Sequence, residues 1–279
     1  MTAPAAFADI PAFLYGTAWK EDDTERLTAL ALEAGFRGID TANQRKHYHE
    51  AGVGAALAAA FANGTLARKD VFLQTKFTFR GGQDHRLPYD PGAPVPMQVE
   101  QSFAQSLAHL GVSTIDSYVL HGPSTRDGLA PADWDAWRAM ERIHDSGKVH
   151  WLGVSNVDLD QLVALCDGAR VRPRFVQNRC FAVHGWDRDV RRICQKNGMI
   201  YQGFSLLTAN GAVLGSATIR DMAHRYGKTP EQIVFRFALD VGMLPLTGTT
   251  SRGHMLADLA VGSFRLSPEE VAAIERLKR

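Results

Sequence analysis

Three ionisable residues, Asp40, Lys76 and His121, stand at the ends of short apolar runs. Such runs predict buried strands, so these side chains lie where strands end. Burying the Lys76 ammonium is costly unless a carboxylate pairs with it, and Asp40 on the neighbouring run is the natural partner. His121 beside such a pair can position a substrate or move a proton. The residue types favour a functional site, with a structural ion pair and a structural histidine as the alternatives.

Eight apolar runs predict the strands that carry these residues. They are Phe13–Thr17, Gly38–Thr41, Val71–Lys76, Ser117–His121, Trp151–Ser155, Phe175–Gln177, Ile200–Ser205 and Met243–Thr247. Amphipathic segments between the runs, such as Asp23–Ala34 and Val99–Leu110, predict helices. Glycines after four such segments predict helix ends, and these are Gly35, Gly111, Gly147 and Gly198.

The alternation of strands and helices predicts an α/β protein. Consecutive parallel strands need crossovers as long as these, so we expect one (β/α)8 TIM barrel that forms a single domain over residues 1–279. In such a barrel the active site lies at the C-terminal mouth of the strands. Further polar residues fall at that mouth, namely Thr17, Ser155, Asn156, Gln177, Ser205 and Thr247.

The composition points to a small-molecule protein. Lys and Arg number 31 against 30 Asp and Glu, and this balance argues against nucleic-acid and membrane partners. The longest uncharged apolar stretch, Ala55–Ala62, is too short to span a bilayer. The 3 cysteines form no CxxC pair or even disulfide set, as is typical of a reducing compartment. We therefore expect a cytoplasmic monomer.

Five short motifs on successive predicted strands resemble those of the aldo-keto reductases in order and strand position. They are Gly38-Ile-Asp-Thr-Ala42, Leu73-Gln-Thr-Lys76, Asp116-Ser-Tyr-Val-Leu-His-Gly-Pro123, Gly153-Val-Ser-Asn156 and Val176-Gln177. The resemblance implies hydride transfer between a nicotinamide cofactor and a carbonyl, with an Asp–Tyr–Lys–His tetrad. Asp40, Lys76 and His121 match this tetrad directly, and His121 would orient the substrate carbonyl.

The tyrosine of the tetrad does not align simply. In the commonest pattern it follows the Asp by five residues, where this chain has Arg45. We assign Tyr48 as the proton donor, because a Lys76 ammonium beside it favours the phenolate. Alignment back from Glu50 places His47 at the tyrosine position, so His47 is the reserve candidate. His47 and Trp19 are also expected to line the substrate pocket.

The resemblance also implies a set of cofactor-binding residues. Ser155, Asn156 and Gln177 would hold the nicotinamide carboxamide, and Phe204 would stack on the ring. Ser205 and Leu207 would approach the phosphates. Thr17 and Thr247 are the remaining predicted cofactor-binding residues at the mouth. A lysine that often contacts the adenosine 2′-phosphate is missing, but Arg252 matches a second basic contact. NADPH is the predicted cofactor, and NADH is the alternative cofactor.

Three other functions compete with carbonyl reduction. A metal-dependent barrel hydrolase would use Asp40, His47, His49 and His121 as ligands, although Lys76 would repel the ion, and we expect no metal site. A Schiff-base aldolase would use Lys76 as its nucleophile. A redox-sensing cofactor-binding protein without turnover is the non-enzymatic alternative.

Overall fold

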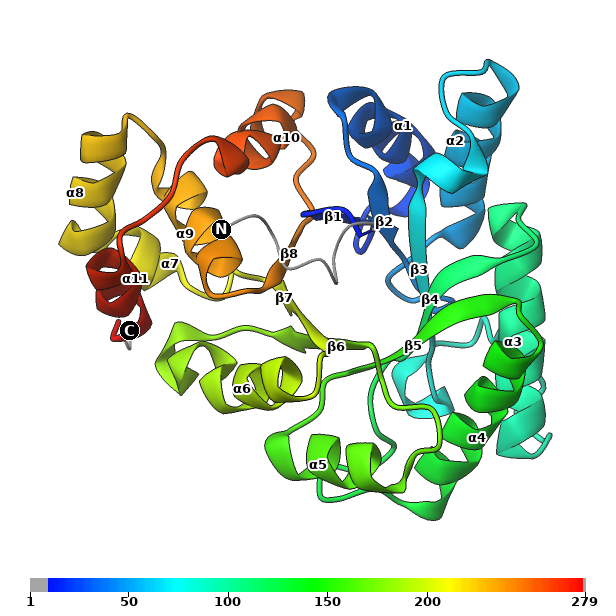
Figure 1. Ribbon diagram of the computed structural model, residues 1–279. Coiled ribbons are helices and arrows are strands. Elements are labelled where there is room, and N and C mark those ends of the chain that lie inside the picture. Colours follow the sequence, from blue (N-terminus) through cyan, green and yellow to red (C-terminus); the bar gives the residue numbers. More distant parts are fainter. Residues whose placement is uncertain (1–9, 278–279) are drawn as a thin grey trace.

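The predicted strands close into a ring in the computed structural model, which describes residues 10–277. Eight parallel strands follow one another around a closed barrel in chain order (Figure 1). The strands are β1 (Leu14–Gly16), β2 (Gly38–Asp40), β3 (Phe72–Phe77), β4 (Ile115–Leu120), β5 (Val149–Ser155), β6 (Phe175–Arg179), β7 (Ile200–Phe204) and β8 (Leu244–Thr247). The predicted fold class is therefore confirmed.

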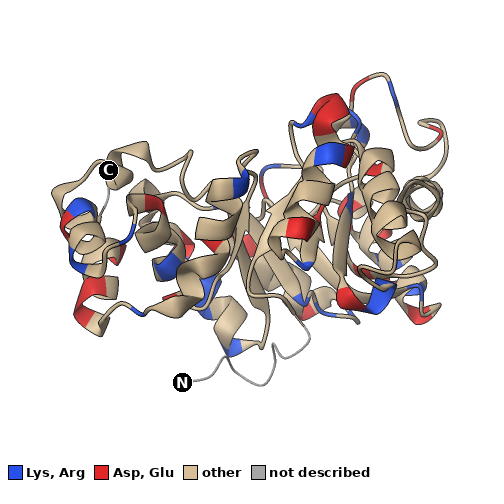
Figure 2. Ribbon diagram, turned by 90° about the horizontal axis from the view of Figure 1, so that it is seen from above, with Lys and Arg blue, Asp and Glu red and all other residues tan. Residues whose placement is uncertain are grey.

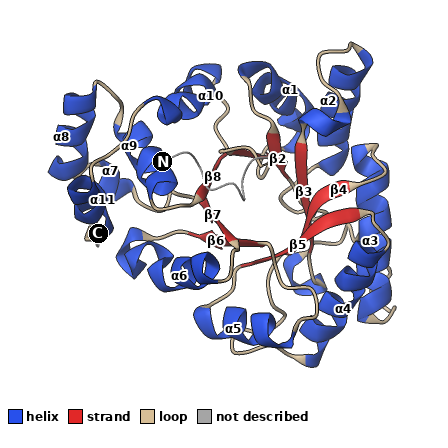
Figure 3. Cartoon of the chain, in the orientation of Figure 1, coloured by secondary structure: helices blue, strands red, loops and turns tan. Residues whose placement is uncertain are grey.

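Helices surround this ring on the outside (Figure 3). They are α1 (Thr24–Ala34), α2 (Glu50–Ala62), α3 (Val95–Leu110), α4 (Pro131–Asp145), α5 (Leu159–Gly168), α6 (Arg188–Lys196), α7 (Gly211–Leu214), α8 (Ala217–Tyr226), α9 (Pro230–Asp240), α10 (Arg252–Leu259) and α11 (Pro268–Glu275). Their apolar faces pack on the outer face of the strands to form the main core.

The helix ends follow the sequence signals closely. The four glycines predicted to end helices, Gly35, Gly111, Gly147 and Gly198, all have positive φ angles. Helix α3 begins at Val95, earlier than the predicted Val99, because Pro96 is tolerated in a first turn where backbone N–H groups have no helical partner.

A second apolar cluster fills the inside of the barrel. Leu14, Phe72, Phe175, Ile200, Leu244 and Leu246 meet there from strands on several sides of the ring. Each neighbouring pair of strands is parallel, so all the carboxyl ends open on the same side. Polar residues at those ends therefore gather at one mouth above an apolar floor.

Charged residues are spread over the outer helices. Figure 2 shows Lys and Arg interspersed with Asp and Glu around the barrel. Within residues 10–277, no helix combines the length and apolar character needed to cross a bilayer.

The contact between α2 and α3 makes a stability prediction. A Cβ at Gly54 would stand 2.0 Å from the carbonyl oxygen of His109 and 3.0 Å from the Cα of Leu110. Gly54→Ala is expected to lower the free energy of unfolding by about 1–3 kcal/mol or more, because the backbones must separate. Urea denaturation measures this. Gly211→Ala is the control, since nothing lies within 4 Å of its added Cβ, and equal effects of the two variants would contradict the prediction.

Candidate active site

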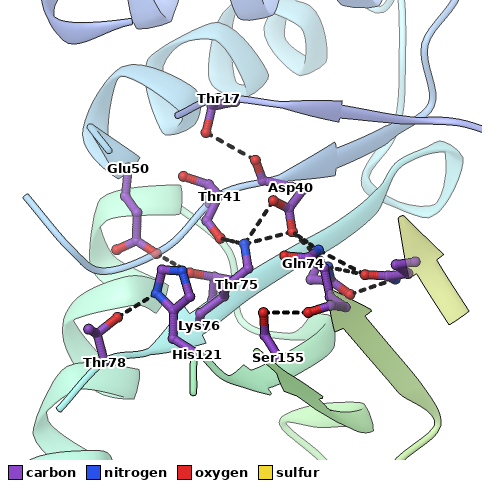
Figure 4. Close-up of polar contacts among 12 residues, drawn as sticks. Thr17, Asp40, Thr41, Glu50, Gln74, Thr75, Lys76, Thr78, His121 and Ser155 are labelled. Atoms are coloured by element: carbon purple, nitrogen blue, oxygen red, sulfur yellow. Dashed lines mark hydrogen bonds and ion pairs between the residues drawn. The ribbon is translucent and has the colours of Figure 1, made fainter. Parts of the chain in front are cut away.

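The centre of the mouth is a buried ion pair between β2 and β3. The Lys76 Nζ lies 2.7 Å from Oδ2 and 2.8 Å from Oδ1 of Asp40, and it also donates to the Thr41 carbonyl oxygen at 2.8 Å (Figure 4). Lys76 is 0% and Asp40 2% exposed. The pairing expected from sequence therefore forms, and all the Lys76 donors face protein acceptors.

Three buried glutamines extend this pair across the barrel. Gln74 and Gln177 each donate from Nε2 to Asp40 Oδ1, at 2.6 and 3.0 Å. The Gln74 and Gln202 amides donate to each other at 2.8 and 3.0 Å, and Gln177 donates to Gln202 at 2.9 Å. The network joins β2, β3, β6 and β7, so it connects the ion pair to Gln177, a predicted cofactor residue.

Tyr48 and His121 stand over the ion pair. The centroid of the Tyr48 ring lies 5.2 Å from Lys76 Nζ and 5.8 Å from the centroid of the His121 ring. We expected the ammonium to favour the Tyr48 phenolate, but burial and the Asp40 carboxylate raise the pKa of Tyr48 above its ordinary value. The reason is that both Asp40 oxygens neutralise Lys76, so no uncompensated cation faces the ring. Tyr48 therefore carries its proton at neutral pH.

His121 is a neutral imidazole. Burial, and to a smaller extent Lys76 and His47, lower the pKa of His121 well below its ordinary value. Its Nδ1 lies 2.7 Å from the Thr78 hydroxyl. Its backbone is fixed on both sides, because its N–H donates to Phe77 and its carbonyl oxygen accepts from Asn156 Nδ2 at 2.7 Å.

One cavity of about 840 Å³ brings most of the predicted site residues together at the mouth. Those that line it are Trp19, Asp40, His47, Tyr48, His121, Ser155, Asn156, Gln177, Phe204, Ser205, Leu207 and Thr247. Lys76 lies buried beneath it. His47 is held at the rim, with its ring 3.9 Å from that of Trp19 and its Nδ1 2.9 Å from Gln44 Oε1.

Two predicted cofactor residues do not line this cavity. Thr17 is fully buried, and its hydroxyl and N–H both bond to the Asp40 carbonyl oxygen at 3.0 Å. The Thr17 hydroxyl therefore bonds to the backbone of β2 and does not line the cavity. Arg252 is exposed and begins α10, just beyond the lining residues Thr249 and Thr250.

Three of the six non-glycine residues with positive φ in the described part of the chain line the cavity. Trp19, Asn156 and Ser205 have φ angles of 61°, 55° and 55°, a region that side-chain-bearing residues seldom adopt. Asn156 and Ser205 directly follow β5 and β7. Strain of this kind persists where a required geometry overrides local preference, as at binding sites.

Lys20 also lines the cavity, although the sequence did not single it out. Its Nζ donates to the carbonyl oxygen of Gly248, another lining residue, at 2.7 Å. Burial lowers the pKa of Lys20 to about 8. His254, Thr249 and Thr250 also line this end of the cavity. Its position shortly after the first predicted strand could have indicated this place at the mouth. Without the strand register, however, the sequence does not distinguish Lys20 from a surface lysine.

A second cavity of about 510 Å³ adjoins His121 on the side of the loop after β3. Thr78, Phe79 and Gly82 from that loop line it, together with residues 122–126 after β4. It shares Gln44, His121 and Asn156 with the larger cavity. The long loop after β3 therefore borders an opening beside His121.

The residues of the metal-hydrolase alternative do not form a ligand set. Within the described part of the chain, no cluster of three or more His, Cys, Asp or Glu side chains could hold an ion. Asp40 is bonded through both oxygens to Lys76, and His47 packs on Trp19. The three cysteines, Cys166, Cys180 and Cys194, are free and buried, as packing residues are expected to be.

Comparison with known proteins identifies the family. The model of the aldo/keto reductase family matches residues 13–279. The chain belongs to this family. Methylglyoxal reductase DkgA of Salmonella typhimurium is 30% identical over 269 residues, covering 93% of this chain and 86% of that relative. Aldo-keto reductase AKR2E4 of Bombyx mori is 28% identical and covers 92% of this chain and 83% of that protein.

Solved structures of the family agree in fold. The Bombyx mori aldo-keto reductase, solved in complex with NADP, superposes with a TM-score of 0.81 at 26% identity and covers 96% of this chain and 89% of that one. An aldo/keto reductase from Brucella melitensis gives a TM-score of 0.79 at 26% identity, covering 96% and 95%. Membership in this family makes the chain an NAD(P)H-dependent oxidoreductase.

Proposed function

We propose that this aldo/keto reductase reduces aldehyde or ketone carbonyls to alcohols with NADPH and with Tyr48 as proton donor. One observation carries the proposal, namely that the Asp40–Lys76 pair lies directly beneath Tyr48 and His121 in the cavity formed by the predicted cofactor residues. We further propose a single-domain cytoplasmic monomer. Three buried free thiols support a reducing compartment.

The mouth fits a nicotinamide cofactor. The Nε2 of Gln177 is bonded to Asp40 and Gln202, and the Nδ2 of Asn156 to His121 and Ser155. Each amide therefore leaves its oxygen available for the N–H groups of a carboxamide. Phe204 offers a flat face in the same cavity. When bound, the cofactor supplies the hydride that reduces the carbonyl carbon.

The choice of NADPH over NADH depends on basic groups at the other end of the cavity. Lys20 lines that end, and Arg252 stands exposed at the first residue of α10. A helix N-terminus and a guanidinium both favour a phosphate group. The additional 2′-phosphate of NADPH is the feature that Arg252 would bind.

The side chains themselves provide positioning and proton transfer. His121, being neutral, donates a hydrogen bond to the substrate carbonyl oxygen from Nε2 and so fixes its orientation. Tyr48 is protonated and gives its proton to the same oxygen as the carbonyl is reduced. The Lys76 ammonium, although paired with Asp40, lies beneath the ring and partly offsets the negative charge that Tyr48 acquires when its proton leaves.

The experiment is NADPH oxidation followed by absorbance with a panel of carbonyls. Methylglyoxal belongs in the panel, because the Salmonella relative is named for its reduction. Carbonyl-dependent oxidation with a stoichiometric alcohol product is the expected result. Tight NADPH binding without turnover on any carbonyl would favour the redox-sensing alternative, and no binding of either nicotinamide cofactor would overturn the assignment.

Lys20 predicts how cofactor affinity depends on pH. A lysine attracts phosphate only while charged, and the pKa of Lys20 is about 8, so the affinity for NADPH is expected to fall as the pH rises through that value. Lys20→Met is expected to weaken binding about 10- to 100-fold near pH 7 and to flatten the pH dependence. Fluorescence titration measures both. Lys69→Met, exposed just before β3 at the other end of the barrel, is the control.

A further inference from the structure

The hydroxyl of Thr78 contacts the catalytic imidazole on the side away from the ion pair. Thr78 follows β3 directly, and its Oγ1 lies 2.7 Å from Nδ1 of His121 (Figure 4). Within residues 10–277, the Thr78 hydroxyl has no other hydrogen-bond partner. Its proton is therefore free to be donated to Nδ1.

Thr78 is held firmly in this place. The residue is 6% exposed, and its carbonyl oxygen accepts hydrogen bonds from the Tyr89 hydroxyl at 2.8 Å and from Gln83 Nε2 at 3.3 Å. Tyr89 is itself buried against Phe77, with ring centroids 5.7 Å apart. The loop after β3 thus presents the hydroxyl at a fixed position instead of letting it rotate into solvent.

A neutral imidazole has one N–H group, and its position decides what His121 can do. If Nδ1 carried the proton, it would donate to Thr78, and Nε2 would turn a lone pair toward the substrate oxygen. If the Thr78 hydroxyl donates to Nδ1, the proton resides on Nε2 and is available to a carbonyl. Only the second arrangement satisfies both ends of the ring when a carbonyl is present.

We propose that Thr78 is a positioning residue that holds His121 in the Nε2–H tautomer. This role rests on the proposed carbonyl reduction, in which Nε2 donates to the substrate. Thr78 itself touches neither reacting atom in that scheme. It acts through the ring, as the partner of the far nitrogen commonly does in histidine sites.

Nitrogen NMR of protein labelled in histidine tests the tautomer directly. The His121 signals are assigned by their loss in His121→Gln. The folded wild-type protein is expected to show a protonated Nε2 and a hydrogen-bonded, unprotonated Nδ1. This readout needs no turnover, so it distinguishes failure of the tautomer assignment from failure of the proposed function. A protonated Nδ1 in the wild-type protein, alone and with NADPH, would overturn the proposal.

Variants test the consequence for catalysis. Thr78→Val keeps the shape but removes the hydroxyl, and kcat is expected to fall about 5- to 100-fold with NADPH affinity unchanged. Thr78→Ser is expected to restore both the tautomer and most of kcat. Thr28→Val is the matched control, because Thr28 is buried in α1 and its hydroxyl has no partner. A Thr78→Val protein that binds NADPH and retains wild-type kcat would contradict the proposal.

Discussion

Replacing Lys76 with Met is expected to cost about 3–5 kcal/mol of unfolding free energy, because it leaves the buried Asp40 carboxylate without its cation. The same change is expected to lower kcat by about 10²- to 10⁴-fold, the range typical of lost acid–base assistance. Chemical denaturation and NADPH oxidation measure the two effects on the same preparation.

The double variant Asp40→Asn with Lys76→Met separates a catalytic role from a structural one. Removing both charges relieves the unpaired carboxylate, so most of the lost stability is expected to return while kcat stays low. Arg236→Met is the matched control for the loss of a buried ion pair, since Arg236 pairs with Asp240 at 2.5 Å in α9, away from the mouth. If the double variant regained activity together with stability, the pair would be structural only.

Tyr48→Phe is expected to lower kcat by about 10²- to 10⁴-fold, because the ring remains but the transferable proton is gone. NADPH affinity is expected to change little, since the aromatic surface in the cavity is preserved. Tyr226→Phe is the control, because its hydroxyl bonds to Glu270 on the outside of the barrel. Stopped-flow measurement of the hydride-transfer step and a fluorescence titration distinguish the two effects.

His47→Ala provides the competing test. His47 packs on Trp19 and bonds to Gln44, so its loss is expected to alter KM for bulky carbonyls more than kcat. The proton-donor assignment would move to His47 if His47→Ala abolished turnover while Tyr48→Phe left it intact. Activity that survives both changes would point to a water molecule as the proton source.

The fold and the meeting of three candidate site residues at one mouth were predictable because they depend on local patterns. Short apolar runs with polar ends mark β2, β3 and β4, and the parallel arrangement then requires Asp40, Lys76 and His121 to share one mouth. The helix-ending glycines were predictable for the same reason, since a left-handed residue after a helix is a local preference.

Contacts between distant strands were not predictable in this way. Gln74 and Gln202 are 128 positions apart and bond only because β3 and β7 face each other across the closed ring. Lys20 lines the cavity because of the path of the backbone after β1. Thr17 does not line it, because its hydroxyl bonds to the backbone of β2. A strand shift of one residue would reverse which side chains point inward, and composition does not record that register.

The pKa of Tyr48 illustrates the same division between sequence and structure. That Lys76 and Asp40 come together follows from the motifs and the order of the strands, whereas the place of Tyr48 does not follow from the motif spacing. The direction of the pKa shift depends on how close Lys76 lies to Asp40 and on how much water is excluded, since electrostatic interactions vary with distance and burial. The residues set which groups are present, and the closed barrel sets their distances, protonation and partners, because those depend on packing in three dimensions.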